Sequence, residues 1–384
     1  MSTVIGTGIS TKLDSFAAGK EAALNAYYQI GKTDPSIIIV FISTIFDQDI
    51  AIKGVHSIIK DTPLIGCSSI GSISTHGSCK DSVTVFIISS DSIKFSCGIG
   101  RDISKNPRLA GHNAAKQASN TRHNPKQAYI ILSDSLAGNN ADILRGSQEV
   151  FGTGFPIIGG GACDKSCFQR TYQYMNSEIL TDSVTGVLVS GSMKLSIGKA
   201  NGWQAIGKSH KVTKVKSNIV KEIDKKPAVK LYEEYFEKSF LELKNNRICS
   251  LGINYPIGMR PDNAKEYVTR VPLAIEESGG LVFNADIQEG EDINLMIGDK
   301  DIVLESTERA VIEAAKDIKN SKINFAVVFS DISRLLLLRK DAYKEIEIIK
   351  QHIGKSTPIL GCYTFGEYQD NFNNQSISIA LFSE

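Results

Sequence analysis

The sequence contains no apolar run that approaches the roughly 20 residues needed to cross a bilayer. Its first residues, Met1-Ser-Thr-Val-Ile-Gly6, lack the basic and apolar segments of a secretory signal peptide. The net charge is only +1, so no overall field attracts nucleic acid or an acidic membrane surface. We therefore expect a cytoplasmic protein that neither binds nucleic acid nor inserts into a membrane.

Patterns typical of metal and nucleotide sites are also lacking. The seven cysteines are scattered, and the one close pair, Cys163 and Cys167, has a C-x3-C spacing that fits neither a zinc ribbon nor a thioredoxin motif. Half of a metal site there stays open as an alternative. The six histidines form no H-E-x-x-H pattern, and Gly159-Gly-Gly161 lacks the Lys-Ser/Thr of a phosphate-binding loop. We expect a reduced protein without a metal or other cofactor.

The chain does contain a short sequence motif, the repeated phrase, that occurs three times. It reads Pro63-Leu-Ile-Gly66-Cys67, then Pro156-Ile-Ile-Gly159-Gly160, and finally Pro358-Ile-Leu-Gly361-Cys362. Each copy follows an apolar strand and a helix and precedes another apolar strand, which indicates internal duplication. We interpret the phrases as glycine turns in comparable places, where they could line one cavity.

The expected fold class is α/β, with repeated strand-helix-turn-strand units forming mixed sheets flanked by helices. With 384 residues, 42% of them hydrophobic, about two domains are expected, and we place them at 1–220 and 221–384. Asp14 should begin a first helix whose inner face carries Phe16, Ala23, Leu24 and Tyr27, and Gly31 should end it. A further helix is expected over 228–244, and an antiparallel hairpin over 267–297 around Gly279-Gly280. The predicted core strands are 37–42, 83–88, 128–132, 185–189, 325–329 and 377–382.

Several short segments, in their order along the chain, carry a resemblance to a known family. They are Ala17-Ala-Gly-Lys-Glu-Ala22, Gly66-Cys-Ser-Ser-Ile-Gly71, Gly202-Trp-Gln-Ala-Ile-Gly207, Ile223-Asp-Lys-Lys-Pro-Ala228, Tyr255-Pro-Ile-Gly258, Tyr267-Val-Thr-Arg270, Phe329-Ser-Asp-Ile-Ser-Arg334 and Gly361-Cys-Tyr-Thr-Phe-Gly-Glu367. Together they resemble the FIST family, with an N-terminal and a C-terminal FIST domain over nearly the whole chain.

The resemblance implies a non-catalytic, intracellular sensory protein that binds small ligands such as amino acids. Two FIST domains account for the whole length, so we expect the signal to pass to a separate partner, such as a kinase or another output protein. Some relatives are implicated in haem-linked nitric oxide sensing, which makes a haem-binding gas sensor an alternative.

Candidate ligand-binding residues cluster at the repeated phrases and at the strand ends beside them. Glycine turns leave backbone N–H groups free to meet a ligand. Arg334 can hold a carboxylate, and Glu367 an ammonium, so that the two would bind a zwitterion unless they pair with each other or face water. Asp331 stands where the family often has cysteine. The full set is Gly66, Cys67, Ser68, Ser69, Asp134, Gly160, Gly161, Asp331, Arg334, Cys362, Tyr363, Thr364 and Glu367.

Two other functions remain open at this stage. Cys67 or Cys362 could act as a nucleophile in an enzyme, although no histidine lies near either one in sequence, and small apolar thiols are common in tight turns. A haem would need an axial ligand, and His76 follows the first turn at a short distance. An adaptor that only binds another protein would leave no mark in the sequence.

Overall fold

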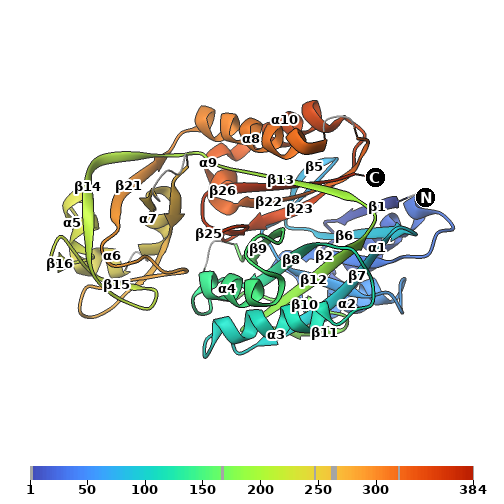
Figure 1. The fold of residues 1–384 in the computed structure, drawn as a ribbon, viewed down its shortest axis with the longest axis horizontal. Coiled ribbons are helices and arrows are strands. Elements are labelled where there is room, and N and C mark those ends of the chain that lie inside the picture. Colours follow the sequence, from blue (N-terminus) through green and yellow to red (C-terminus); the bar gives the residue numbers. More distant parts are fainter. Residues whose placement is uncertain (1–2, 166–167, 246–247, 261–265, 319–320, 384) are drawn as a thin grey trace.

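The main body of the protein is built from one supersecondary unit that occurs three times, and a fourth, antiparallel part lies beside it (Figure 1). The structure, a computed structural model, describes residues 3–165, 168–245, 248–260, 266–318 and 321–383. Within these residues each copy contains a strand, a helix, a strand, a helical segment, a strand, a short hairpin and a final strand. The predicted class, α/β with mixed sheets flanked by helices, is confirmed.

The three copies follow one another along the chain. Copy 1 consists of β1 (Thr3–Ser10), α1 (Ser15–Ile30), β2 (Ile37–Ile42), α2 (Gln48–His56), β3 (Leu64–Ser68), β4 (Gly71–Ser74), β5 (Gly77–Lys80) and β6 (Val83–Ser90). Copy 2 consists of β7 (Ile93–Arg101), α3 (Pro107–Ser119), β8 (Lys126–Asp134), α4 (Asn140–Phe151), β9 (Ile157–Ala162), β10 (Gln173–Met175), β11 (Glu178–Leu180) and β12 (Ser183–Gly191). Copy 3 consists of β13 (Lys194–Asn201), α8 (Lys300–Ala315), η1 (Lys316–Ile318), β22 (Ile323–Asp331), α9 (Ile332–Leu338), η2 (Arg339–Asp341), α10 (Tyr343–Ile353), β23 (Ile359–Thr364), β24 (Glu367–Tyr368), β25 (Phe372–Asn373) and β26 (Ser376–Ser383).

An insertion interrupts copy 3 between β13 and α8. It consists of β14 (Trp203–Lys216), β15 (Ile219–Ile223), β16 (Lys226–Pro227), α5 (Lys230–Phe236), α6 (Phe240–Asn245), α7 (Ile248–Asn254), β17 (Ile257–Met259), β18 (Val268–Arg270), β19 (Pro272–Ile275), β20 (Leu281–Phe283) and β21 (Asp292–Gly298). Its strands form an antiparallel sheet in the order β18-β17-β21-β14-β15-β20-β19, with an apolar core of its own. In Figure 1 the insertion stands to the left of the three copies.

Two sequence predictions concern the insertion directly. The predicted hairpin is confirmed, since β19 and β20 pair antiparallel on either side of Gly279-Gly280. The single helix predicted over 228–244 is wrong: α5 ends at Glu237, whose left-handed backbone (φ 50°) breaks the helix before α6 begins. The proposed division between residues 220 and 221 falls within β15 and stays a prediction.

The three copies exchange their hairpins in a closed cycle. The sheet of copy 1 has the order β1-β6-β2-β3 and ends with β10-β11 from copy 2. The sheet of copy 2, β7-β12-β8-β9, ends with β24-β25 from copy 3, and that of copy 3, β13-β26-β22-β23, ends with β4-β5 from copy 1. Because each hairpin completes the sheet of another copy, no copy has its full sheet by itself.

The inner faces of these three sheets share one apolar core. It combines residues such as Phe41, Leu132 and Phe329 from the second strand of each copy. The outer face of each sheet is covered by its own helices: α1 and α2, α3 and α4, and α8 with α10. Both faces of the central strands are therefore buried, which explains their continuous apolar runs.

The repeated phrase forms strands, and the prediction that it forms turns is wrong. Gly66, Gly159 and Gly361 lie inside β3, β9 and β23. A methyl group on any of them would collide with a carbonyl oxygen of the parallel neighbouring strand, that of Val40, Ile131 or Val328 respectively. Glycine is needed here for close approach between strands, whereas a local reading of the sequence takes it as a turn signal.

The first helix has the predicted limits, but the predicted inner face is only partly right, because Ala23 is buried whereas the two aromatic residues are not. The Asp14 carboxylate accepts a hydrogen bond from the Ala17 amide (2.7 Å), and Gly31 follows the last residue. Phe16 and Tyr27, predicted to face inward, are 40% and 38% exposed. The buried side of α1 consists of small residues, among them Ala22 and Ala26, because their backbone lies directly against Gly6 and Gly8 of β1.

The strand glycines provide a test of the packing. We expect Gly361→Ala to lower the free energy of unfolding by about 3 kcal/mol, because the added methyl meets backbone that can move only with β22. Urea denaturation of the full chain measures this change. Gly154→Ala is the matched control, since nothing lies within 4 Å of the added methyl and the residue is exposed. Equal stability of the two variants would contradict the close-approach explanation.

Candidate functional site

The structure brings most of the predicted residues together where the three copies meet, but it packs them against one another. The Ser69 hydroxyl donates to the carbonyl oxygens of Tyr363 and Gly71, both at 2.7 Å. The Cys163 thiol donates to the same Tyr363 carbonyl at 3.1 Å. Gly66, Cys67, Ser68, Ser69, Gly160, Gly161, Cys362, Tyr363 and Thr364 are all buried.

The glycines of copy 2 leave no open space at this junction. A methyl on Gly160 would collide with the Thr364 side chain, and one on Gly161 with Ser135. The Gly161 amide donates to the Gly366 carbonyl (2.9 Å), and the Phe365 amide donates back to Gly161 (2.9 Å). These backbone groups bind the hairpin of copy 3, so they are not available to a ligand.

The two predicted aspartates, Asp134 and Asp331, are held at the ends of β8 and β22. Asp134 accepts hydrogen bonds from the Thr171 hydroxyl (2.8 Å) and the Asp182 amide (2.9 Å). Asp331 caps α9 by accepting from the amide (2.8 Å) and the hydroxyl (2.5 Å) of Ser333. Burial raises the pKa of both carboxyls, while these hydrogen bonds act in the opposite direction.

Arg334 lies in α9 and is completely buried, facing α8 and α10. Its guanidinium donates twice to one Glu345 oxygen, at 2.9 and 2.7 Å. Further donors reach the Ser306 hydroxyl (2.9 Å) and the Thr307 hydroxyl (2.7 Å). The structure thus pairs Arg334 with Glu345 and does not bring it into contact with Glu367, so the two do not form the zwitterion site predicted for them.

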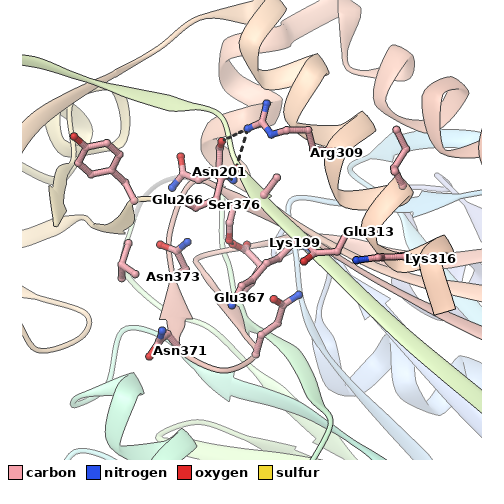
Figure 2. A pocket seen from close by; sticks show the side chains of 15 residues that line it. Lys199, Asn201, Glu266, Arg309, Glu313, Lys316, Glu367, Asn371, Asn373 and Ser376 are labelled. Atoms are coloured by element: carbon pink, nitrogen blue, oxygen red, sulfur yellow. Dashed lines mark hydrogen bonds and ion pairs between the residues drawn. The ribbon is translucent and has the colours of Figure 1, made fainter. Parts of the chain in front are cut away.

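Glu367 is the predicted residue that reaches a pocket. Its carboxyl accepts a hydrogen bond from the Thr364 hydroxyl (2.5 Å) on one oxygen and from the Ser376 hydroxyl on the other. The side chain is only 2% exposed, and it lies at the inner end of the pocket (Figure 2). Burial, reinforced by nearby Asp331, raises the pKa of Glu367 well above its usual value.

The pocket has a volume of about 580 Å³ and lies where the insertion meets copy 3. Its walls come from β13, α8, the β24–β25 hairpin and the segment that enters β18. Figure 2 shows Arg309 on one side, with its guanidinium donating to the Asn201 carbonyl (3.1 Å) and the Glu266 carboxylate (3.2 Å). The polar side chains that line the pocket are Lys199, Asn201, Glu266, Arg309, Glu313, Lys316, Glu367, Gln369, Asn371, Asn373 and Ser376.

Sequence reasoning missed every one of these residues except Glu367. They come from four separate segments of the chain, 199–201, 266–268, 309–316 and 367–376, so no local spacing marks them. One signal was available: Glu367 begins a run rich in side-chain amides that includes Gln369, Asn371 and Asn373. Such a run next to a candidate acid is unusual for a buried hairpin and favours a polar site.

Comparison with known proteins now identifies the family. The FIST N domain model matches residues 36–226, and the FIST C domain model matches residues 228–369. The chain belongs to the FIST family. FIST domains are associated with small-ligand-sensing signal transduction. The two models meet beyond residue 220, within the insertion and not between copies of the repeat.

Similar proteins add little about the chemistry of this FIST protein. An uncharacterized protein of Methanocaldococcus jannaschii is 24% identical over 81% of this chain, which spans only 62% of that relative's length. A cyanuric acid hydrolase of A. caulinodans aligns over 100% of this chain and 99% of its own, with 8% identity and a TM-score of 0.39. A second cyanuric acid hydrolase aligns at 7% identity over 100% of both chains, with a TM-score of 0.41. Likeness at this level says nothing about function.

The pocket does not fit a haem. Among the described residues that line it, none is a histidine, cysteine or methionine, the usual axial ligands. His76, the predicted alternative, is exposed in the turn between β4 and β5. In the described part of the chain no group of three or more His, Cys, Asp or Glu side chains could hold a metal ion, and Cys167 of the C-x3-C pair lies outside it. Among the described helices, none has the length and apolar character that crossing a membrane requires.

The cysteines of the repeated phrase lie in the shared core. Cys67 and Cys362 are both fully buried, and Cys163 adjoins them. Burial raises the pKa of Cys362 and of Cys163, which disfavours the thiolate that a nucleophile needs. This environment gives no support to the alternative of a cysteine-dependent enzyme.

The buried ion pair gives a prediction about stability. Arg334→Ala should lower the free energy of unfolding by about 3–5 kcal/mol, because it leaves the Glu345 carboxylate buried without its partner. Lys53→Ala, which breaks the exposed pair with Asp49, should cost no more than about 1 kcal/mol. Chemical denaturation compares the two. If Arg334→Ala is as mild as the surface variant, the structural role assigned to Arg334 is wrong.

Thiol labelling provides a second test. In the native protein, the half-exposed Cys79 should react with a maleimide at least about tenfold faster than Cys163 or Cys362, whose thiolates are disfavoured by burial. Mass spectrometry of digested samples assigns the labelled positions, and labelling after denaturation confirms that every thiol can react. Preferential labelling of Cys362 would restore the enzyme hypothesis.

Proposed function

We propose that this FIST protein is a non-catalytic sensor that binds a small polar ligand, of the size of an amino acid, in the pocket between copy 3 and the insertion. The observation that carries the proposal is the pocket itself. It combines a buried carboxyl, Glu367, with cations from other walls, Arg309 and Lys316. In a volume of about 580 Å³, such groups can orient a ligand with separated charges.

The proposed ligand lies beside the contacts that attach the insertion to the body. Thr269 of β18 receives hydrogen bonds on its hydroxyl from Asn201 (2.9 Å), and its amide donates to Asn373 (2.7 Å). Asn201 and Asn373 also line the pocket. A ligand that binds these amides better in one position of the insertion than in another shifts the balance between them.

The proposed readout is a separate partner protein that recognises the position of the insertion. The pocket and the insertion account for sensing, whereas neither the ligand nor the partner is identified by the residues. The free cysteines, among them Cys67 and Cys163, suit the reducing cytoplasm in which we propose that the protein works.

A thermal-shift screen of the full chain against amino acids and other small metabolites tests the proposal. A ligand at about 100 times its dissociation constant should stabilise the fold by roughly 2.7 kcal/mol, which raises Tm by a few degrees. Ile312→Trp should abolish this shift, because Ile312 is half exposed at the pocket wall and the larger ring fills the entrance.

Leu109→Trp is the matched control, since Leu109 is equally exposed on α3, away from this pocket. It should keep the full shift. A ligand whose shift survives Ile312→Trp binds elsewhere, which would refute the assigned site. No shift with any compound would argue for an adaptor that recognises only a protein.

A further inference from the structure

Glu367 differs from every other buried acid near the pocket in lacking a structural task that uses its charge. Glu345 neutralises Arg334, and Asp331 caps a helix. Glu367 receives only two hydroxyl hydrogen bonds, from Thr364 and Ser376, and in the described part of the chain it forms no ion pair. Its carboxyl is nevertheless fixed in position, with each oxygen bound by one hydroxyl.

The charged groups described around Glu367 do not neutralise it. They either carry a negative charge themselves or pair with another acid. From β22, Asp331 adds a second negative group, and Arg334 of α9 acts weakly because Glu345 holds it. Across the pocket, Lys199 pairs with Asp370 at 2.7 Å. Among the described residues, neither Arg334 nor Lys199 is therefore left to pair with a carboxylate at this place.

Cations on the remaining walls are likewise balanced by acids. On α8, Arg309 pairs with Glu266 (3.2 Å). Lys316, the first residue of η1, lines the same wall as the acid Glu313 of α8, and both are exposed. None of these groups forms an ion pair with Glu367 in the described residues. The carboxyl is thus buried, oriented and uncompensated, and burial favours its neutral form.

We propose that this pocket recognises a ligand through a cationic N–H group, such as a primary ammonium, that pairs with Glu367 as a carboxylate, and that binding releases one proton to solvent. The inference rests on the proposed function and assigns the chemistry of its ligand. The exchange is balanced: the ammonium keeps its three protons, the carboxylic acid loses one, and the bound pair is neutral. The Thr364 and Ser376 hydroxyls then donate one hydrogen bond to each carboxylate oxygen.

The sign of the pH dependence follows from this exchange. Below the pKa of Glu367 in the empty pocket, each binding event must remove a proton, so affinity increases about tenfold per pH unit as the pH rises. Above that pKa the carboxylate is already formed, and the dependence disappears. A ligand that lacks a cationic group gains nothing from the rise in pH.

The experiment uses n-propylammonium and 1-propanol, two probes of equal chain length that differ in charge. Calorimetric titration of the full chain in two buffers of different ionisation enthalpy counts the protons released. We expect n-propylammonium to bind with release of about one proton and 1-propanol to bind at least about tenfold more weakly with none. The carboxyl carbon signal of Glu367, assigned by its loss in Glu367→Gln, should move to the ionised position on binding.

Glu305→Gln is the matched control, because it removes a negative charge from an exposed position of α8 outside the pocket lining and leaves the buried acid in place. It should keep proton release, and Glu367→Gln should lose both tight binding and release. If n-propylammonium binds the unmodified chain with neither proton release nor a rise in affinity with pH at any pH tested, the inference is overturned while the pocket remains a ligand site. If a different, uncharged metabolite from the screen binds and n-propylammonium does not, the chemistry assigned to Glu367 is wrong. If Ile312→Trp leaves all binding unchanged, the proposed site itself fails.

Discussion

Close approach of backbone to backbone is the constraint on which the rest of this structure depends. In each copy, glycines of the first strand lie directly against alanines of the first helix: Gly8 against Ala22, Gly100 against Ala110, and Gly198 against Ala310. Because the helices lie so near the sheets, large side chains are left for the inner faces, where the three sheets share one core. That shared core, with the cyclic exchange of hairpins, fixes the positions of the strand ends.

The threefold repetition also relates the pocket at Glu367 to the equivalent positions in the other two copies. Strand register makes three residues equivalent: Gln173 pairs with Cys67, Glu367 with Gly160, and Ser72 with Cys362. Each is the first or second residue of its hairpin and lies next to the third strand of another copy. In copy 3, the segment between the first strand and the first helix is the whole insertion, which lies beside Glu367. In copies 1 and 2 the corresponding segment is a short loop. The insertion therefore adds a wall beside Glu367 that the equivalent positions in copies 1 and 2 lack.

The sequence predicts those parts of the fold that depend on local pattern. Continuous apolar runs identify the central strands because both of their faces are buried, and Asp14 identifies the start of α1. The first strand of each copy was not predicted, since Gly6 and Gly8 interrupt the apolar pattern that marks a strand. The local sequence predicts a turn at Gly361. The reason why glycine is needed there, close approach to a carbonyl group of the neighbouring strand, lies outside the local sequence. Similarly, Glu345, the partner of Arg334, lies on another helix. Sequence spacing does not reveal this pair, so the sequence predicts a ligand-binding role for Arg334 instead.

The two buried acids Glu345 and Glu367 differ in how their charge is compensated, and this difference is the reason for proposing that only Glu367 meets a ligand. Arg334 and Glu345 compensate each other and gain further hydrogen bonds, an arrangement whose loss is costly but which offers nothing to a ligand. Glu367 has the same depth of burial without a cation, so its ionised form is disfavoured until one arrives. An acid kept uncompensated at the end of a pocket stabilises the ligand-bound state more than the empty one. Such a difference between two states is what a sensor requires, because a ligand can shift an equilibrium only by its unequal affinity for the two forms.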